Sequence, residues 1–275
     1  MDKNILTFFN TINKEYIHPK GKKATQVLLN ELIPVENEKI LEIGFGTGSS
    51  LIHTFSHSES IKLYGVEKSK LMLKKATSRI KFCGLKDKII LSLLEEETQN
   101  IPFPSNFFDK IYIESVLGIQ EGDYLEKMIR EIGRVLKTGG VLCINELLWS
   151  TKVPVEKIQA TNKFVLKNFG IIQANEKYPY FKDWEKLFIK NYFFLNKSMN
   201  LNESHHFDSV KSDVKLKLFL SQIFSLLGVI KSKIFIRYRN EWNSYKKNMN
   251  KIDSQITLEP YLLRFIKSNP TNKID

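Results

Sequence analysis

Three glycines spaced two residues apart are the clearest sign of a binding site in this chain. Gly44, Gly46 and Gly48 follow the short apolar run 40–43, and a helical pattern begins directly after them. Glycines let a backbone turn sharply and approach a ligand closely, and the first turn of a helix offers free N–H groups. The pattern predicts a buried strand, a tight turn containing Thr47, and a helix N-terminus that together hold a ligand.

Glu42 lies on the predicted strand just before the first glycine, and its charge favours one of two cofactor classes. A dinucleotide site needs its glycine turn to face a pyrophosphate, with an acid about 20 residues further on for the ribose. Glu42 would repel a pyrophosphate, whereas it would attract a cation such as the ammonium or sulfonium group of S-adenosylmethionine. The residues therefore favour a methyl donor over a nicotinamide.

Alternating strands and helices position this turn. Strands are predicted at 61–67, 88–94, 108–114 and 141–145, and helices at 49–55, 69–83 and 124–136. Strands separated by helices indicate βαβ units and a parallel sheet, on which ligands bind at the carboxyl ends of the strands. Acids lie at or just after five such ends: Glu42, Glu67, Glu97, Glu114 and Glu146. In the helix at 69–83, we expect Leu71, Leu73, Ala76 and Ile80 to face inward.

Further motifs follow in order along the first half of the chain. The run ILEIGFGTG at 40–48 is joined by IPFP…FFD at 101–109 and by IGRVLKTGG at 132–140. This ordered set resembles the class I S-adenosylmethionine-dependent methyltransferases, with Thr138 in place of the usual proline of the "RVLKPGG" turn. The resemblance covers roughly residues 20 to 150 and is closest to the small-molecule branch that includes ubiquinone, menaquinone and sterol methyltransferases.

The resemblance implies a fold, a cofactor and a set of binding residues. The expected fold is α/β, a Rossmann-like seven-stranded, mostly parallel sheet with an antiparallel last strand and a helical cap. The expected cofactor is S-adenosyl-L-methionine. Glu67, followed by Lys68, matches the acid that holds the ribose hydroxyls, and Glu97–Thr98 is similar in position to the adenine-binding acid. Glu114 is expected to frame the methionine end of the cofactor.

Two further stretches carry the candidate catalytic residues. IHPKGKKAT at 17–25 and NELLW at 145–149 resemble segments of small-molecule and bacterial members. His18 is the best base by residue type because its unperturbed pKa lies near neutrality, and its alternative is a loop histidine that positions the N-terminal lid. Glu146 is a base, a substrate-orienting group or a carboxylate that binds nearby backbone. The pair His205–His206 lacks a third ligand of fitting spacing, so no metal site is predicted.

The chain is predicted to contain a catalytic core with cap segments from several places. The expected segments are N-terminal lid helices at 1–33, the S-adenosylmethionine-binding core at 34–150, a cap helix and strand six at 151–207, a basic helical insertion at 208–251, and the last strand with the tail at 252–275.

Charge and composition limit the function classes. Of the net charge of +12, the stretch 211–251 carries +8, from ten Lys and Arg residues against two acids. The basic insertion is either a solvated helix pair of the cap, a peripheral membrane contact, or a nucleic-acid surface. Only two cysteines are present and no apolar run approaches about 18 residues, so we expect a soluble, cytoplasmic protein without a signal peptide.

The predicted function is in-line methyl transfer from S-adenosylmethionine to an oxygen, nitrogen or carbon atom of a small, apolar metabolite. Positioning the nucleophile against the methyl group and excluding water would supply much of the rate. One alternative is a non-catalytic cofactor-binding protein whose basic helices contact a membrane or a partner. Another is an RNA methyltransferase, which the stretch ESVL at 114–117 disfavours because it lacks the "(N/D)PP(Y/F)" motif of many base-modifying members.

Overall fold

The computed structural model describes residues 4–95, 100–203, 214–252 and 257–269. Glu97 and Thr98, the predicted adenine-binding residues, lie outside these ranges, and so does the pair His205–His206. The glycine turn and the other predicted strand ends all lie inside them.

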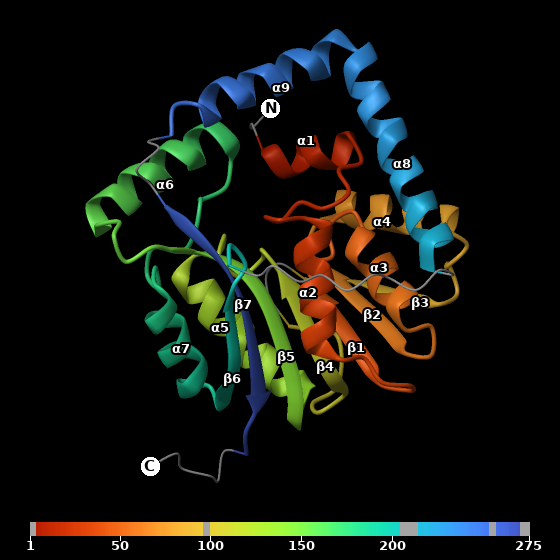
Figure 1. Ribbon diagram of the computed structural model, residues 1–275, viewed down its shortest axis with the longest axis vertical. Coiled ribbons are helices and arrows are strands. Elements are labelled where there is room, and N and C mark those ends of the chain that lie inside the picture. Colours follow the sequence, from red (N-terminus) through yellow and green to blue (C-terminus); the bar gives the residue numbers. More distant parts are fainter. Residues whose placement is uncertain (1–3, 96–99, 204–213, 253–256, 270–275) are drawn as a thin grey trace.

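A seven-stranded sheet forms the centre of the described chain, in the order β3-β2-β1-β4-β5-β7-β6 (Figure 1). The strands from β3 to β5 pair in parallel, and β7 runs antiparallel to both β5 and β6. The predicted sheet, mostly parallel with an antiparallel last strand, is confirmed. The strands are β1 Lys39–Ile43, β2 Lys62–Glu67, β3 Ile89–Leu93, β4 Phe108–Glu114, β5 Leu136–Trp149, β6 Phe193–Asn200 and β7 Leu258–Lys267.

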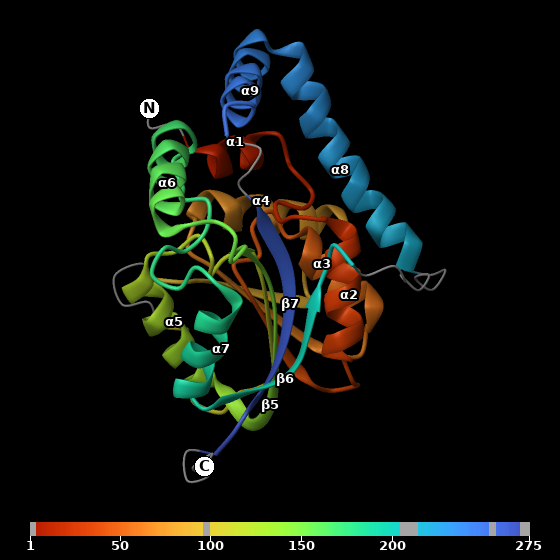
Figure 2. The same ribbon diagram turned by 60° about the vertical axis from the view of Figure 1, so that its left-hand side comes forward.

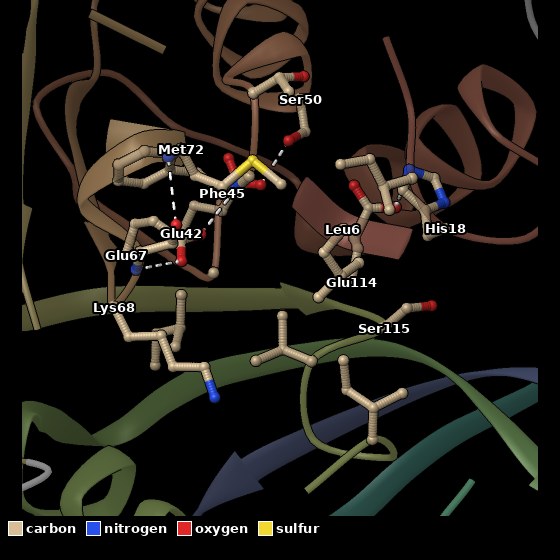
Figure 3. Close-up of a pocket in the computed structure, with 18 of the residues that line it drawn as sticks. Leu6, His18, Glu42, Phe45, Ser50, Glu67, Lys68, Met72, Glu114 and Ser115 are labelled. Carbon is tan, nitrogen blue, oxygen red and sulfur yellow. Dashed lines mark hydrogen bonds and ion pairs between the residues drawn. The ribbon is translucent and has the colours of Figure 1, made fainter. Parts of the chain in front are cut away.

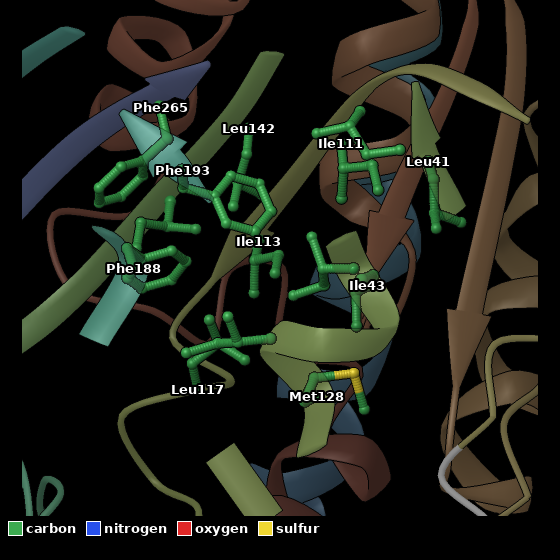
Figure 4. Close-up of a cluster of buried hydrophobic side chains, with 14 of the residues drawn as sticks. Leu41, Ile43, Ile111, Ile113, Leu117, Met128, Leu142, Phe188, Phe193 and Phe265 are labelled. Carbon is green, nitrogen blue, oxygen red and sulfur yellow. The ribbon is translucent and has the colours of Figure 1, made fainter. Parts of the chain in front are cut away.

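Helices cover both faces of the sheet because successive side chains of a strand point to opposite faces. Leu41 and Ile43 of β1 face a hydrophobic cluster with α5 and α7, which Figure 4 shows together with Met128 and Phe188. Ile40 faces the opposite cluster, with α2, α3 and α4. These helices are α2 Lys22–Leu32, α3 Ser49–His57, α4 Lys70–Phe82, α5 Gly122–Val135 and α7 Phe181–Lys190.

Two details differ from the predicted elements. The turn expected at 137–140 is part of β5, where the pairing with β4 shifts register between Phe108 and Lys110. β5 continues to Trp149, so Glu146 lies inside this strand, opposite Tyr261 of β7, and not after the strand end. On α4, the expectation that Leu71 faces inward is wrong, because Leu71 is exposed while Arg79 is buried in its place on the inner face.

Helices from three distant parts of the sequence form a cap beyond the carboxyl ends of the parallel strands (Figures 1 and 2). Phe8 stacks on Trp242 and Phe169 stacks on Tyr245, each pair with ring centroids 5.7 Å apart. The cap helices are α1 Ile5–Thr11, α6 Val155–Phe169 and α9 Ile236–Met249. The described cap helices from the predicted segments 1–33, 151–207 and 208–251 thus pack on one another, while α2 packs on the sheet.

One long helix connects this cap to the side of the core. α8 (Val214–Ile234) runs along α3 and α4, and α9 leaves it at an angle of 95°. Within the described ranges, no single helix is long and apolar enough to cross a membrane. α8 and α9 meet that length and composition only when they are taken together as a bent pair.

Candidate active site

The glycine turn between β1 and α3 requires glycine at two positions for the same reason. Gly44 has φ +74° and Gly48 has φ +83°, both in the left-handed region. A Cβ on Gly44 would lie 2.3 Å from Cγ2 of Val116, and one on Gly48 would lie 2.9 Å from Cβ of Ala76. The turn is therefore pressed against the loop after β4 and against α4, which no other residue type would allow without a shift.

A cavity of about 230 Å³ opens beside this turn (Figure 3). Carboxylates from the ends of three neighbouring strands line it, and the remaining walls contain apolar side chains together with further polar ones such as Glu15 and Gln120. The structure brings the following predicted residues to this cavity: His18, Glu42, Gly44, Gly46, Thr47, Glu67, Lys68 and Glu114. Gly48 shapes the turn from outside the lining, and Glu146 lies in a neighbouring cavity.

Glu42 is only 2% exposed and is held by two hydroxyl groups. Ser50 Oγ donates to one carboxylate oxygen, and Tyr112 OH donates to the other at 2.7 Å. Burial raises the pKa of Glu42 to about 8, with the nearby charges of Glu114 and Glu67 acting in the same direction and the two hydrogen bonds acting against them. A cation beside this carboxyl would favour its ionised form, so cation binding at neutral pH would release a proton.

Glu67 joins the glycine turn to the start of α4. Its Oε2 accepts the backbone N–H of Gly46 at 3.0 Å, and its Oε1 accepts the backbone N–H of Ser69 at 2.9 Å. Burial raises the pKa of this carboxyl, while the two backbone hydrogen bonds lower it. The carboxylate thereby sets the position of the turn and still faces the cavity (Figure 3).

Glu114, the last residue of β4, gathers side chains from both stretches that carry the candidate catalytic residues. Thr25 Oγ1 donates to its carboxylate at 2.9 Å, and Asn145 Nδ2 donates at 3.3 Å. His18 Nε2 lies 3.2 Å from Oε2 of Glu114. The sequence placed His18 and Glu114 in the site, but it did not reveal that Thr25 and Asn145 would link them.

Both ring nitrogens of His18 are engaged. Nε2 faces the carboxylate of Glu114, and Nδ1 lies 3.1 Å from the carbonyl oxygen of Pro19. Thr25 Oγ1 also lies 3.1 Å from Nε2, and Asn145 Nδ2 lies 3.4 Å from Nδ1, so both ring nitrogens face groups of the protein itself. This geometry favours a role for His18 in positioning the N-terminal loop over a role in removing a proton.

Glu146 is buried and its carboxylate is saturated by backbone donors. Oε1 accepts the N–H groups of Val116 and Leu117, both at 2.8 Å, and Oε2 accepts that of Gly118 at 3.1 Å. Burial raises the pKa of Glu146 to about 7, although these three hydrogen bonds lower it. Of the roles left open by the sequence, the contacts favour a carboxylate that orders the loop 116–118.

A second cavity, of about 390 Å³, adjoins the first beneath the cap. α1, α6 and the end of α9 contribute apolar side chains to its wall, among them Phe9, Val165, Phe169 and Met249. Both cavities are lined by Leu6, Tyr16, Ile17, His18, Ser115 and Ile119. At this boundary, Ser115 Oγ is buried without a hydrogen-bond partner in the described part of the chain.

Thr47 and Arg79 connect the glycine turn to the cap. Thr47 Oγ1 donates to the carbonyl oxygen of Lys14 at 2.6 Å, which fixes the N-terminal loop over the turn. The fully buried Arg79 donates to the carbonyl oxygen of Asn13 at 2.9 Å and to Ser225 Oγ of α8 at 2.8 Å. A single arginine on a helix gave no sequence signal, since most arginines are solvated.

The side chains around the first cavity fit S-adenosylmethionine. Glu42 and Glu114 supply negative charge for a ligand with an ammonium and a sulfonium group, and Glu67, at the end of the neighbouring strand β2, is available for a ribose diol. Leu94 and Met72 offer apolar surface for a flat ring. The unpartnered Ser115 Oγ leaves a further polar group for a ligand at the boundary.

Known proteins are similar to this chain in sequence and in fold. A family model described as a methyltransferase domain matches residues 41–144. The demethylmenaquinone methyltransferase of Bacteroides fragilis is 30% identical over 188 residues, which are 67% of this chain and 75% of that protein. Phosphoethanolamine N-methyltransferase 2 of Haemonchus contortus, solved with S-adenosyl-L-methionine, has a TM-score of 0.65 at 17% identity, covering 96% of this chain and 57% of its own. Geranyl diphosphate C-methyltransferase of Streptomyces coelicolor has a TM-score of 0.57 at 12% identity, covering 89% and 78%.

The sheet order and the glycine turn, with carboxylates at three strand ends, define a Rossmann-like fold that binds its ligand at the carboxyl edge of the sheet. With the matching domain and the Bacteroides fragilis relative, the chain belongs to the class I S-adenosylmethionine-dependent methyltransferases. It is a methyltransferase of the small-molecule type, and S-adenosylmethionine is its cofactor.

Proposed function

We propose that this enzyme methylates an oxygen, nitrogen or carbon atom of a small, apolar molecule held in the second cavity. The observation that carries the proposal is the shared boundary of the two cavities, at Tyr16, His18 and Ser115. A donor in the first cavity and an acceptor in the second would meet there. The cap above them would exclude water from the reacting groups.

Within this proposal each carboxylate of the first cavity has a separate role. Glu67 binds the ribose hydroxyls, with Lys68 beside it, while Glu42 and Glu114 balance the positive charges of the methionine end. Gly44 and Gly46 let the turn approach the ligand, and Thr47 holds the N-terminal loop over it. The adenine contacts of Glu97 and Thr98 remain predictions, since these residues lie outside the described ranges.

The chemistry requires little of the protein beyond alignment. Bound S-adenosylmethionine would supply a methyl group on a cationic sulfur: the acceptor atom would bond to the methyl carbon in line as the carbon–sulfur bond breaks, and S-adenosylhomocysteine would leave. We propose that His18 and Glu146 contribute by positioning: His18 through its contact with Glu114, and Glu146 through the three N–H groups of the loop 116–118. Ser115 lines both cavities, and its buried hydroxyl has no partner among the described residues, so it is then the group best placed to orient a polar atom of the acceptor.

The wall of the second cavity supports an apolar acceptor. Phe9, Val165, Phe169 and Met249 offer hydrocarbon and aromatic surface, which gains free energy by covering an apolar molecule. The name of the Bacteroides fragilis relative specifies a demethylmenaquinone acceptor, and the Streptomyces coelicolor enzyme was solved with geranyl diphosphate. Peripheral membrane contact through residues 208–251 belongs to the same proposal, because an apolar acceptor dissolves in lipid.

Calorimetric titration with S-adenosylmethionine and with S-adenosylhomocysteine tests the first half of the proposal. The absence of heat with both ligands, for a folded protein, would contradict it. Incubation of lipid and polar metabolite extracts with methyl-labelled cofactor then tests the acceptor class. We expect label in an organic-phase product, and label confined to polar metabolites would rule out the apolar acceptor.

A variant that fills the second cavity separates the two binding events. Ile172 lines only the second cavity, so Ile172→Trp should lower methyl transfer to the labelled acceptor at least about tenfold through steric exclusion. Cofactor affinity should stay within twofold of the wild type. Equal losses of cofactor binding and turnover would mean that the second cavity is not the acceptor site.

A further inference from the structure

The bend between α8 and α9 exposes apolar side chains among cations. We call residues 230–239, IKSKIFIRYR, the corner; the segment contains four basic residues and no acid. Ile234, Phe235 and Ile236 are 68%, 52% and 64% exposed. Lys231, Lys233, Arg237 and Arg239 are exposed around them. In Figures 1 and 2 the corner lies at the end of the molecule opposite to the sheet end that the cap does not cover.

The apolar surface of the corner continues along α8. The residues of its outer face are large, apolar and exposed: Leu216, Phe219, Leu226, Leu227 and Ile230. The inner face carries Ser221 and Ser225, which are buried against Arg79, together with the buried Leu218. A helix of a soluble domain usually buries its large apolar residues, whereas α8 also exposes those of its outer face.

Contacts on the inner face hold α8 in this orientation. Arg79 Nη1 donates to the carbonyl oxygen of Ser221 at 3.0 Å and to its Oγ at 2.9 Å. Asn13 Nδ2 donates to the carbonyl oxygen of Phe224 at 3.0 Å. Gly228 packs so closely that an added Cβ would lie 2.2 Å from the carbonyl oxygen of Ile12. The helix therefore cannot turn the leucines of its outer face inward without losing these contacts.

We propose that the corner and the outer face of α8 insert into an anionic lipid surface. Exposed isoleucine and phenylalanine side chains on a projecting bend gain free energy in the acyl boundary, and the flanking cations pair with anionic headgroups. The four cations of the corner argue against an apolar protein surface as the partner, because contact with such a surface would be unfavourable for the charges. Nucleic acid would bind the cations but would leave the aliphatic side chains in water.

This contact would place the acceptor site next to lipid, a consequence that rests on the proposed function. α9 runs from the corner to Met249, whose side chain is part of the wall of the second cavity. Its aromatic residues Trp242 and Tyr245 pack on α1 and α6, so the corner and the cap form one body. An apolar acceptor dissolved in the bilayer would then be close to the cavity that is proposed to receive it.

Vesicle sedimentation tests the proposal directly. The full chain is mixed with extruded vesicles of phosphatidylcholine alone, or of phosphatidylcholine with 30% phosphatidylglycerol, at several salt concentrations. We expect binding to the anionic vesicles, weakened by salt, and little binding to the neutral ones. Lys231→Glu/Lys233→Glu should weaken binding about 30-fold, and Phe235→Ser should weaken it about tenfold.

Matched variants far from the corner serve as controls. Lys86→Glu/Lys88→Glu reverses two exposed lysines at the same spacing, and Phe194→Ser removes a phenylalanine that is 53% exposed on β6. Neither should change binding more than twofold. Equal losses in corner and control variants would overturn the proposal, and so would full binding by Phe235→Ser, which indicates a purely electrostatic contact open to RNA.

Cofactor titration of the same variants keeps this proposal separate from the proposed function. The corner variants should bind S-adenosylmethionine like the wild type, since no corner residue lines the first cavity. A wild type that binds anionic vesicles but no cofactor would contradict the proposed function alone. A wild type that binds cofactor but no anionic vesicle would contradict the lipid contact alone.

Discussion

The first cavity and the α8–α9 insertion both bury charged or polar side chains, but these side chains have different hydrogen-bonding partners. In the cavity, Glu42, Glu67 and Glu114 accept hydrogen bonds from the surrounding chain and still face the space for a ligand. At the insertion, Arg79 donates to the serines of α8 through Nη1, while its buried Nε has no hydrogen-bond partner in the described part of the chain, and the outer face of α8 stays apolar and exposed. Buried polar groups therefore mark a ligand site in one region and an attachment in the other.

The two regions also differ in the feature that makes an unfavourable contribution to the free energy of the chain alone. Burying carboxylates raises their pKa, and a cationic ligand recovers that cost on binding. Exposing leucine and phenylalanine costs free energy in water, which a lipid surface would recover. Both regions thus keep unfavourable features whose compensation comes from outside the chain.

Removing Arg79 should give the largest effect on stability. Arg79→Ala leaves the Asn13 carbonyl and the two α8 serines without their donor, so we expect the free energy of unfolding to fall by about 3 kcal/mol in urea denaturation. Arg130→Ala, at an exposed arginine of α5, should change it by less than about 0.5 kcal/mol. If Arg79→Ala lowers the free energy of cofactor binding by more than it lowers the free energy of unfolding, the first cavity and the α8–α9 insertion are not separate.

Adding a methyl group to the glycine turn should give the next largest effect. Gly44→Ala forces a left-handed alanine and a clash with Val116, so it should lose about 2 kcal/mol more than Gly84→Ala. Gly84 is a matched control because its φ of +71° is similar and an added Cβ would meet no atom within 4 Å. Equal losses would mean that close approach at Gly44 contributes nothing beyond backbone strain.

Glu67→Gln tests the carboxylate that joins the turn to α4. Glutamine keeps one acceptor oxygen, but its NH₂ group would face the N–H of either Gly46 or Ser69. We expect S-adenosylmethionine affinity to fall about 10- to 100-fold in calorimetry. Glu36→Gln, at an exposed acid, should leave the affinity unchanged. An unchanged affinity in Glu67→Gln would argue against ribose binding at this strand end.

The raised pKa of Glu42 predicts a pH dependence with a definite sign. Between the ordinary value of 4.5 and about 8, the folded protein without ligand holds a proton that the unfolded chain releases. This contribution to stability is present at low pH and is lost as the pH rises through about 8. Cofactor affinity should change the other way, rising by up to about tenfold per pH unit toward pH 8.

Calorimetry in buffers of different ionisation enthalpy measures this linkage. Wild-type protein should release a proton when it binds S-adenosylmethionine at pH 7, because the cation favours ionised Glu42. Glu42→Gln should bind without that release and should lose this part of the pH dependence of stability. Identical proton release by both proteins would assign the proton to another group.

Sequence reasoning named many of the residues that line the first cavity because the pattern behind them is local. A strand, a glycine turn and acids at later strand ends are adjacent in the chain or repeat with each βαβ unit. It could not tell that Glu146 would be enclosed by three N–H groups of the loop 116–118, which comes from another part of the chain. The adenine-binding role of Glu97 and Thr98 stays a prediction, because these residues lie outside the described ranges.

The sequence by itself determined the sheet, the glycine turn between β1 and α3, and the cationic character of 208–251. Each depends on residue types within one segment, where hydrophobic period, glycine and charge act over a few residues. Only the tertiary structure decided which faces are buried. On α4 it turned Arg79 inward and Leu71 outward, because α8 arrives with serines to receive the guanidinium. The α8 serines that accept hydrogen bonds from the buried Arg79 lie more than 140 residues away in the sequence, so no local pattern could indicate this contact.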